Sequence, residues 1–182
     1  EGLIKVVQGK GMFVNGPKTE RDLESLGGYR HTMRERGKDA STRVLIKAVR
    51  DAGPYYARLL ELSSQDPVWY IRRVDYANGE ALALEEIYIP YDLIPGLGDI
   101  DIGLFSIYDA YTWNGIQLDV ANQVLRITTL EPSFSKLIDL SPGQAVMEFS
   151  YQVRDTGGRV IEFARNFIRG DRTEFIVHYS NH

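Results

Sequence analysis

The sequence repeats itself, and this repeat limits the folds that the chain can adopt. A shift of 78 residues aligns Gly37 with Gly115, Pro54 with Pro132, Leu62 with Leu140, Ser63 with Ser141, Val68 with Val146 and Gly79 with Gly157. With one inserted residue in the second half, Tyr88–Ile89 then aligns with Phe167–Ile168. Because neither half can cover its own apolar strands alone, we expect two similar halves that share one antiparallel sheet.

Each half is predicted to contain a helix, a strand, a second helix and a hairpin. In the first half these elements are Tyr29–Arg36, Thr42–Arg50, Pro54–Glu61 and Val68–Pro90. In the second half they are Leu104–Trp113, Val120–Thr129, Pro132–Asp139 and Val146–Arg169, and a closing strand follows over Glu174–Ser180. The alternation and the helix signals predict an α+β fold: a mixed or antiparallel sheet of six to seven strands, a pseudo-two-fold internal repeat and short helices on one side.

The hairpin Val68–Pro90 carries charged residues on strands that are otherwise apolar. Its turn at Asn78–Gly79 is a strong hairpin signal. A two-residue turn sets Arg72 opposite Glu85, whereas a three-residue loop with a Gly bulge, which we favour, places Arg73 on the same face as Glu85. Because charges are rarely buried without a partner, the pair is either a structural ion pair or the floor of a pocket for a polar small molecule.

Composition excludes several classes of function. The chain has 182 residues, of which 43% are hydrophobic, and it is predicted to fold as a globular domain. It has no cysteine and three histidines, which does not support disulfides or a metal centre, and we expect no cofactor. No apolar run is long enough for a membrane span, and the net charge of −4 argues against a broad nucleic-acid surface. We expect a cytoplasmic protein, and a start at Glu1 within a strand-like run suggests a piece of a longer chain.

The sequence shows no positive signal for catalysis. The histidines lie far from any G-x-S-x-G motif, and no G-x-x-x-x-G-K-[ST] motif is present. Glu85 and Glu86 are adjacent in a predicted strand, so they lie on opposite faces and cannot act on one bond. We therefore predict that the chain is not an enzyme.

A second candidate for binding is the start of the helix Leu104–Trp113. Ser106 and Tyr108 stand there, where free backbone N–H groups and the helix dipole favour a phosphate or carboxylate. The alternative is an ordinary N-cap serine beside a packed tyrosine.

Two parts of the chain resemble known domains. GLIKVVQGKGMFV, residues Gly2–Val14, resembles the end of the winged-helix domain of GntR regulators, whose wing reads G-L-I-x-x-x-x-G-x-G-T-F-V, with Met12 in place of Thr. The remainder resembles the effector-binding (UTRA) domain of the HutC subfamily, which has the chorismate-lyase-like fold. The matching segments are GYRHTMRERG, ASTRVL, RRVDYANGEALALEEIYIP, SIY and VIEFARNFIRGDR. The resemblance covers nearly the whole chain and implies a wing remnant over 1–16, a linker over 17–28 and an effector-binding domain over 29–182.

The resemblance also implies roles for single residues, because members of the family often bind a phosphorylated sugar or another small metabolite. Arg73 matches the first arginine of an R-x-R motif, but the second falls on Asp75. Glu85 matches the acidic residue that takes substrate hydroxyls. Ser106 and Tyr108 match the S-x-Y that holds a phosphate.

Two further differences from the family concern charge. Tyr29 matches the aromatic residue that opens the first helix, but Arg30 follows where a small hydroxyl residue is expected. An arginine is thus missing at Asp75 and another is gained at Arg30, which means either charge relocated within one anion pocket or a less anionic effector. Glu162 and Arg169 match positions of the second hairpin, and Arg169 holds either the fold or the ligand.

The resemblance implies a homodimeric repressor that senses a small molecule. Binding of a sugar phosphate or another anionic metabolite would change the spacing of the DNA-reading heads. Gln8, Lys10 and Gly11 of the wing would contact operator DNA in the full-length protein, but one wing offers few phosphate contacts. An enzyme of the same fold, acting on a small aromatic or carboxylic acid, is the alternative. A pure dimerisation module, in which Arg73 and Glu85 serve only each other, is a third.

Overall fold

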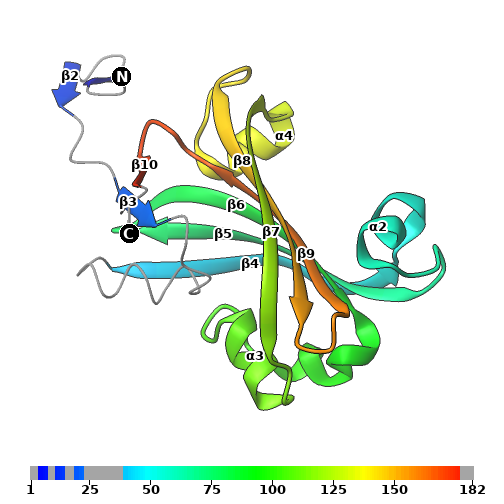
Figure 1. Ribbon diagram of the computed structural model, residues 1–182. Coiled ribbons are helices and arrows are strands. Elements are labelled where there is room, and N and C mark those ends of the chain that lie inside the picture. The colour runs from blue at the N-terminus through cyan, green and yellow to red at the C-terminus, as the bar shows by residue number, and fades with distance from the viewer. Residues whose placement is uncertain (1–3, 8–10, 15–18, 23–38, 177–182) are drawn as a thin grey trace, which may run out of the picture.

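The computed structural model describes residues 4–7, 11–14, 19–22 and 39–176 (Figure 1). The strands of its main sheet are β4 (Ala40–Asp51), β5 (Pro67–Ala77), β6 (Glu80–Pro90), β7 (Leu118–Thr129), β8 (Ala145–Asp155) and β9 (Val160–Ile168). The helices are α2 (Gly53–Leu60), α3 (Ile107–Trp113) and α4 (Pro132–Ser135), with 3-10 turns η1 (Tyr91–Leu93), η2 (Pro95–Asp99) and η3 (Lys136–Ile138). No helix in these ranges is long and apolar enough to cross a membrane.

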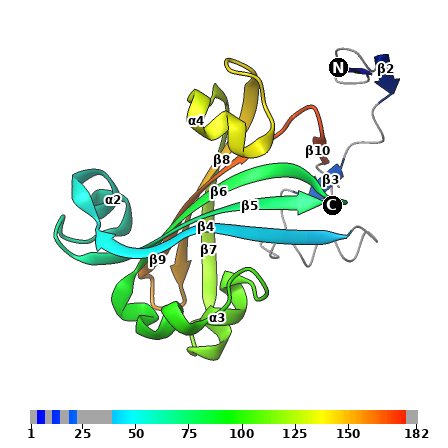
Figure 2. The same ribbon diagram turned by 180° about the vertical axis from the view of Figure 1, so that it is seen from behind.

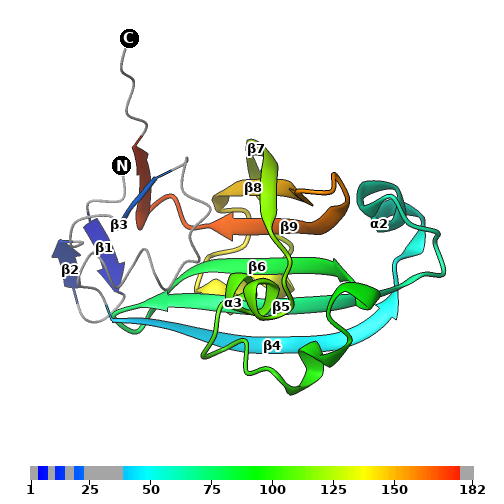
Figure 3. The same ribbon diagram turned by 60° about the horizontal axis from the view of Figure 1, so that its bottom comes forward.

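The main sheet confirms the predicted α+β architecture and its repeat. Its six strands run antiparallel in the order β4-β5-β6-β9-β8-β7, so the two halves meet where β6 pairs with β9 (Figure 3). Each half consists of a strand, a helix and a hairpin. The two halves also agree in the backbone conformation of the residue that follows the helix. Glu61 after α2 and Asp139 after η3 occupy equivalent positions, and both adopt the left-handed conformation, with φ of 57° and 53°.

Helices cover both faces of the sheet, so the prediction of helices on one side was wrong (Figure 2). The α2 face, as we call it, is covered by α2 and by α4 with η3, which come from the repeat itself. The opposite α3 face is covered by α3, the predicted first helix of the second half, and by the 3-10 turns η1 and η2, which precede it in the sequence. Burial of β6 and β9 on both faces requires this second layer, since their apolar residues form nearly continuous runs.

The hairpin β5–β6 closes on Asn78–Gly79, and both residues have positive φ, 51° and 78°. This is the two-residue turn, so the predicted three-residue loop was wrong. A β-bulge between Asp75 and Tyr76 shifts the pairing register of β5 and β6 on the side of the bulge away from the turn. Arg73 therefore faces Glu85 across the strands, and the predicted pairing of these two residues is confirmed.

In the described ranges, four short strands lie outside the main sheet. β1 (Ile4–Val7) and β2 (Gly11–Val14) pair antiparallel where the sequence predicts the wing hairpin. β3 (Thr19–Asp22) falls within the predicted linker and pairs in parallel with β10 (Thr173–Ile176). The predicted helix over Tyr29–Arg36 lies outside the described residues. The same holds for the part of the predicted closing strand Glu174–Ser180 that follows Ile176.

Candidate functional site

Charged and hydroxyl side chains gather on the α3 face of the sheet. We call this group the carboxylate cluster, and it comprises Arg73, Asp75, Glu85, Tyr108, Tyr111, Tyr151 and Glu162. Its four charged members are buried in the fold. Since buried charges are costly unless they are paired or hydrogen-bonded, the contacts of each one show what the site can do.

Arg73 and Glu85 form a direct ion pair. The Nε of Arg73 lies 2.6 Å from Oε2 of Glu85, and the two residues are 8% and 4% exposed. The hydroxyl of Tyr151 donates to the other carboxylate oxygen of Glu85 at 2.9 Å. The carboxylate of Asp75 also attracts Arg73, and the hydroxyl of Thr42 donates to Asp75 at 2.7 Å. The guanidinium is thus paired with the carboxylate of Glu85 and attracted by that of Asp75.

Glu162 is a further buried carboxylate of the cluster. Its Oε2 accepts a hydrogen bond of 2.7 Å from the hydroxyl of Tyr111. Burial raises the pKa of Glu162 to about 7; the Tyr111 hydrogen bond opposes this shift and the charge of Glu85 adds to it. Burial also raises the pKa of Tyr108, and the carboxylates of Glu162 and Glu85 raise it further. The Tyr108 side chain therefore reaches the same cluster from α3.

The cluster holds more negative than positive charge. Among the described residues it contains three carboxylates, from Asp75, Glu85 and Glu162, and one guanidinium, from Arg73. Carboxylates act as hydrogen-bond acceptors, so the cluster is suited to a molecule that brings hydroxyl or amino donors.

Glu162→Gln is expected to flatten the pH dependence of stability between pH 4.5 and 7. Because the pKa of Glu162 is raised in the folded state to about 7 from an ordinary 4.5, its protonated form stabilises the fold at low pH. That contribution, about 3 kcal/mol at most, disappears as the pH rises through 7. Unfolding by urea at pH 5 and pH 8 measures the difference. Asp99→Asn, which removes an exposed carboxylate, is the control. An unchanged difference in Glu162→Gln would contradict the raised pKa.

Ser106 forms the N-cap of α3. Its hydroxyl accepts a hydrogen bond of 3.0 Å from the amide of Asp109, and its own amide donates to the carboxylate of Asp109 at 2.8 Å. The two residues form a capping box. Ser106 is therefore an N-cap, as the alternative predicted, and the carboxylate of Asp109 also lies at the helix start. A role of Ser106 in holding a phosphate remains a prediction.

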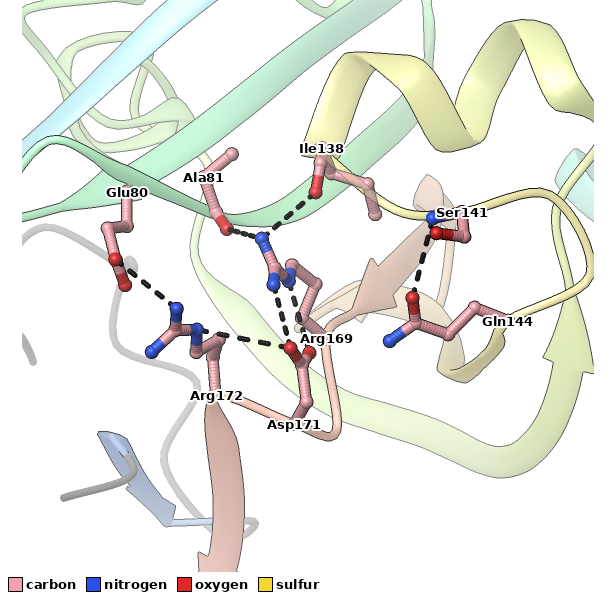
Figure 4. Close-up of polar contacts among 8 residues, drawn as sticks. All are labelled: Glu80, Ala81, Ile138, Ser141, Gln144, Arg169, Asp171 and Arg172. Carbon is pink, nitrogen blue, oxygen red and sulfur yellow. Dashed lines mark hydrogen bonds and ion pairs between the residues drawn. The ribbon is translucent and has the colours of Figure 1, made fainter. Parts of the chain in front are cut away.

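Arg169 lies on the other face of the sheet. Its guanidinium donates to both carboxylate oxygens of Asp171, at 3.1 and 2.7 Å, and to the carbonyls of Ala81 and Ile138 (Figure 4). Ile138 packs with Phe167 in the core on the α2 face, whereas the neighbouring Asn166 faces Glu85. The structure thus brings together Arg73, Glu85, Tyr108 and Glu162 but does not add Arg169 to them.

Most of the remaining predicted site residues fall outside the part of the chain that the structure describes. Tyr29, Arg30, Gln8 and Lys10 lie outside the described residues, and Gly11 is the first residue of β2.

Two tyrosines of the cluster were missed from the sequence, although signals for both exist. Tyr111 follows Tyr108 by three residues on one helix, a spacing that places both on one face. Tyr151 aligns with Arg73 under the 78-residue shift, so the repeat relates it to the best candidate of the first half.

A second network of charged residues lies on the α2 face and stabilises the fold. Glu86 accepts from Arg72 at 3.0 Å, from Arg165 at 2.6 Å and from the hydroxyl of Tyr70. Arg72 and Glu86 also face each other across β5 and β6. This pair therefore provides an internal comparison for Arg73 and Glu85.

The sequence matches the family model described as the UTRA domain over residues 35–174. The HTH-type transcriptional repressor NagR of Bacillus subtilis is 29% identical over 98% of this chain and 73% of its own. The mannosyl-D-glycerate transport/metabolism system repressor MngR of Escherichia coli is 26% identical over 96% of this chain and 73% of its own.

Solved structures show the same fold. PhnF of Mycobacterium smegmatis has a TM-score of 0.85 at 22% identity and covers 99% of this chain and 80% of its own. The C-terminal domain of the histidine utilization repressor of Pseudomonas syringae has a TM-score of 0.73 at 18% identity and covers 79% of this chain and 100% of its own. The curated relatives are transcriptional regulators, which supports a regulator over the alternative of an enzyme. The chain belongs to the UTRA domain family and is the effector-binding part of a GntR-type transcriptional regulator.

Proposed function

We propose that this chain is the sensing and dimerisation part of a homodimeric repressor whose effector, a sugar phosphate or another anionic metabolite, binds at the carboxylate cluster. The observation that supports this most directly is the buried guanidinium of Arg73 under α3, which can take the anionic group, with carboxylates beside it that can accept from the hydroxyls of the same ligand. A core without a ligand gains little from such a group, since an apolar replacement of similar volume is often as stable.

The ion pair between Arg73 and Glu85 suggests how a sugar derivative with an anionic group is recognised. The anionic group takes the guanidinium of Arg73, and Glu85 is then free to accept from sugar hydroxyls. Glu162 and the tyrosines supply further acceptors. The name of the E. coli relative refers to mannosyl-D-glycerate, a sugar derivative that carries a carboxylate, which supports this class of ligand.

The effector acts by shifting the population of two arrangements of the dimer. A ligand can shift such an equilibrium only by its difference in affinity for the two states. Rearrangement of the ion pair under α3 is a local change that the ligand can couple to the DNA-reading heads. In the full-length protein these heads bind operator DNA in the cytoplasm, and Gln8, Lys10 and Gly11 of the wing contribute contacts.

The test is a thermal-unfolding screen with matched pairs of hexoses and hexose phosphates, extended to carboxylic acids and amino acids. A ligand at 100 times its Kd stabilises the folded state by about 2.7 kcal/mol. We expect a phosphorylated or carboxylated sugar to stabilise the protein and its uncharged counterpart to do so less. Stabilisation by none of these classes would overturn the effector proposal, and turnover of a bound metabolite would favour the enzyme.

Ser106→Ala separates an anion-binding role from a capping role. Loss of the cap lowers the free energy of unfolding by about 1 kcal/mol. If the hydroxyl also holds the anion, the affinity for a phosphorylated sugar falls about tenfold, as expected for a hydrogen bond to a charged group, while the uncharged sugar is unaffected. Thr112→Ala removes another hydroxyl of α3, which bonds the carbonyl of Tyr108 at 2.9 Å, and is the control. Equal losses for both sugars would leave Ser106 as a cap alone.

A further inference from the structure

Asn166 of β9 carries a buried hydrogen-bond acceptor that is not used. The residue is 6% exposed, and its Oδ1 has no hydrogen-bond partner in the part of the chain that the structure describes. Buried polar groups nearly always have a partner, and one without a partner lowers stability. Gln152 of β8 shows the usual case, since its amide Nε2 donates to the carbonyl of Leu59 at 2.6 Å.

Asn166 lies on the α3 face, next to the carboxylate cluster. It pairs with Glu85 of β6 on one side and with Phe149 of β8 on the other. Residues that pair directly across neighbouring strands share one face of the sheet. Glu85 in turn pairs with Arg73 of β5. One row therefore crosses the four central strands β5, β6, β9 and β8 (Figure 3), and it consists of Arg73, Glu85, Asn166 and Phe149.

The neighbours of Asn166 in this row explain why its acceptor is left over. All four residues of the row are at most 8% exposed. Arg73 and Glu85 form an ion pair with each other. The side chain of Phe149 has no hydrogen-bond donor, and an ionised Glu85 offers only acceptors. The donor for Asn166 therefore has to come from another molecule.

We propose that Asn166 contacts the effector and selects one with a hydroxyl or amino donor, which its Oδ1 accepts. The Cβ atoms of directly opposed residues are about 5 Å apart, so one sugar ring can contact Glu85 and Asn166 at once. The groups of the ligand then follow the order of the row: the anionic group at Arg73, a hydroxyl at Glu85 and the donor at Asn166. This inference rests on the proposed function and adds to it a donor at a defined place.

A buried amide of this kind provides selectivity at the expense of stability. A site with a buried polar group discriminates against ligands that leave the group unpaired. The ligand-free protein already contains the unpaired Oδ1, so an effector with the donor removes a cost that an analogue without the donor retains. An apolar residue at position 166 should therefore stabilise the ligand-free protein and abolish the selectivity.

Thermal unfolding of the dialysed, ligand-free protein is the first measurement. Asn166→Val removes both polar groups of the amide and suits a strand, and it is expected to raise the Tm by about 2–4 °C. Asn166→Leu, which keeps the branched shape at greater length, is the second variant. Gln152→Met is the matched control, because it removes an amide that has its partner; its Tm should fall by a similar amount.

Calorimetric titration with glucose 6-phosphate and its 2-, 3- and 4-deoxy analogues is the second measurement. The wild type should bind the analogue that lacks the donor for Asn166 about tenfold more weakly than glucose 6-phosphate. Asn166→Val should bind both equally weakly. The loss for a hydroxyl that contacts Glu85 should remain in Asn166→Val, and Gln152→Met should behave as the wild type.

The outcomes separate Asn166 from the effector proposal. A Tm that rises in neither Asn166 variant overturns the inference, and so does an unchanged pattern of affinities for the analogues; neither result affects the binding of an anionic sugar at Arg73. A raised Tm together with the lost discrimination supports it. If the wild type binds none of these probes, the Tm decides alone: a rise supports Asn166 as the acceptor for a different ligand, and no rise overturns it.

Discussion

Arg73→Met is expected to lower the free energy of unfolding by about 3–5 kcal/mol and to abolish stabilisation by the effector. The substitution leaves Glu85, which is 4% exposed, without its cationic partner, and removing one member of a buried pair has a cost of this size. The effector loses the cation that we propose to bind its anionic group. Urea unfolding and the ligand-induced shift in Tm measure the two effects.

The double variant Arg73→Met/Glu85→Gln separates the fold from the ligand. Because residue 85 no longer carries a buried charge without a cationic partner, the double variant should recover part of the lost stability, yet it should not respond to the effector. Arg72→Met is the matched control: Arg72 pairs with Glu86 on the α2 face, and its side chain is 23% exposed against 10% for Arg73. It should destabilise less and respond normally. An effector response that returns in the double variant would make the ion pair purely structural and would place the ligand site elsewhere.

The architecture was predictable because its signals repeat. β5 and β8 begin 78 residues apart, at Pro67 and Ala145, and the Asn-Gly turn fixes the first hairpin. The second layer of helices was not predicted. A strand buried on both faces shows a nearly continuous apolar run, as β6 does, whereas a half-buried strand alternates apolar and polar residues, and the two patterns are hard to tell apart in a short strand.

The candidate site was predictable by residue type but not by geometry. The pairing of Arg73 with Glu85 was predicted from a three-residue loop, which the structure does not contain. The pairing results instead from the β-bulge between Asp75 and Tyr76, which no residue pattern predicts. Ser106 was given two roles from one position, since an N-cap and an anion site use the same amides. Tyr151 reaches Glu85 from a strand of the other half, a contact that depends on the order of strands in the sheet.

Arg169→Met is expected to lower the free energy of unfolding by about 3–5 kcal/mol while leaving effector affinity unchanged. The guanidinium joins the turn after β9 to the beginning of β6 and the end of η3, through Asp171 and the carbonyls of Ala81 and Ile138 (Figure 4). Loss of this group leaves the half-buried Asp171 with a weaker partner and two carbonyls without this donor. A buried charged group bound in this way is among the most costly to remove.

Arg172→Met is the control for the same turn. Arg172 lies 3.3 Å from the exposed Glu80 and 3.9 Å from Asp171, and a pair with an exposed carboxylate contributes about 0–1 kcal/mol. Urea unfolding should therefore separate the two arginines by more than about 2 kcal/mol. Calorimetric titration with the effector then decides the role of Arg169. A large loss of affinity in folded Arg169→Met, absent from Arg172→Met, would return Arg169 to the ligand site; equal affinities make it a clamp between β6, η3 and β9.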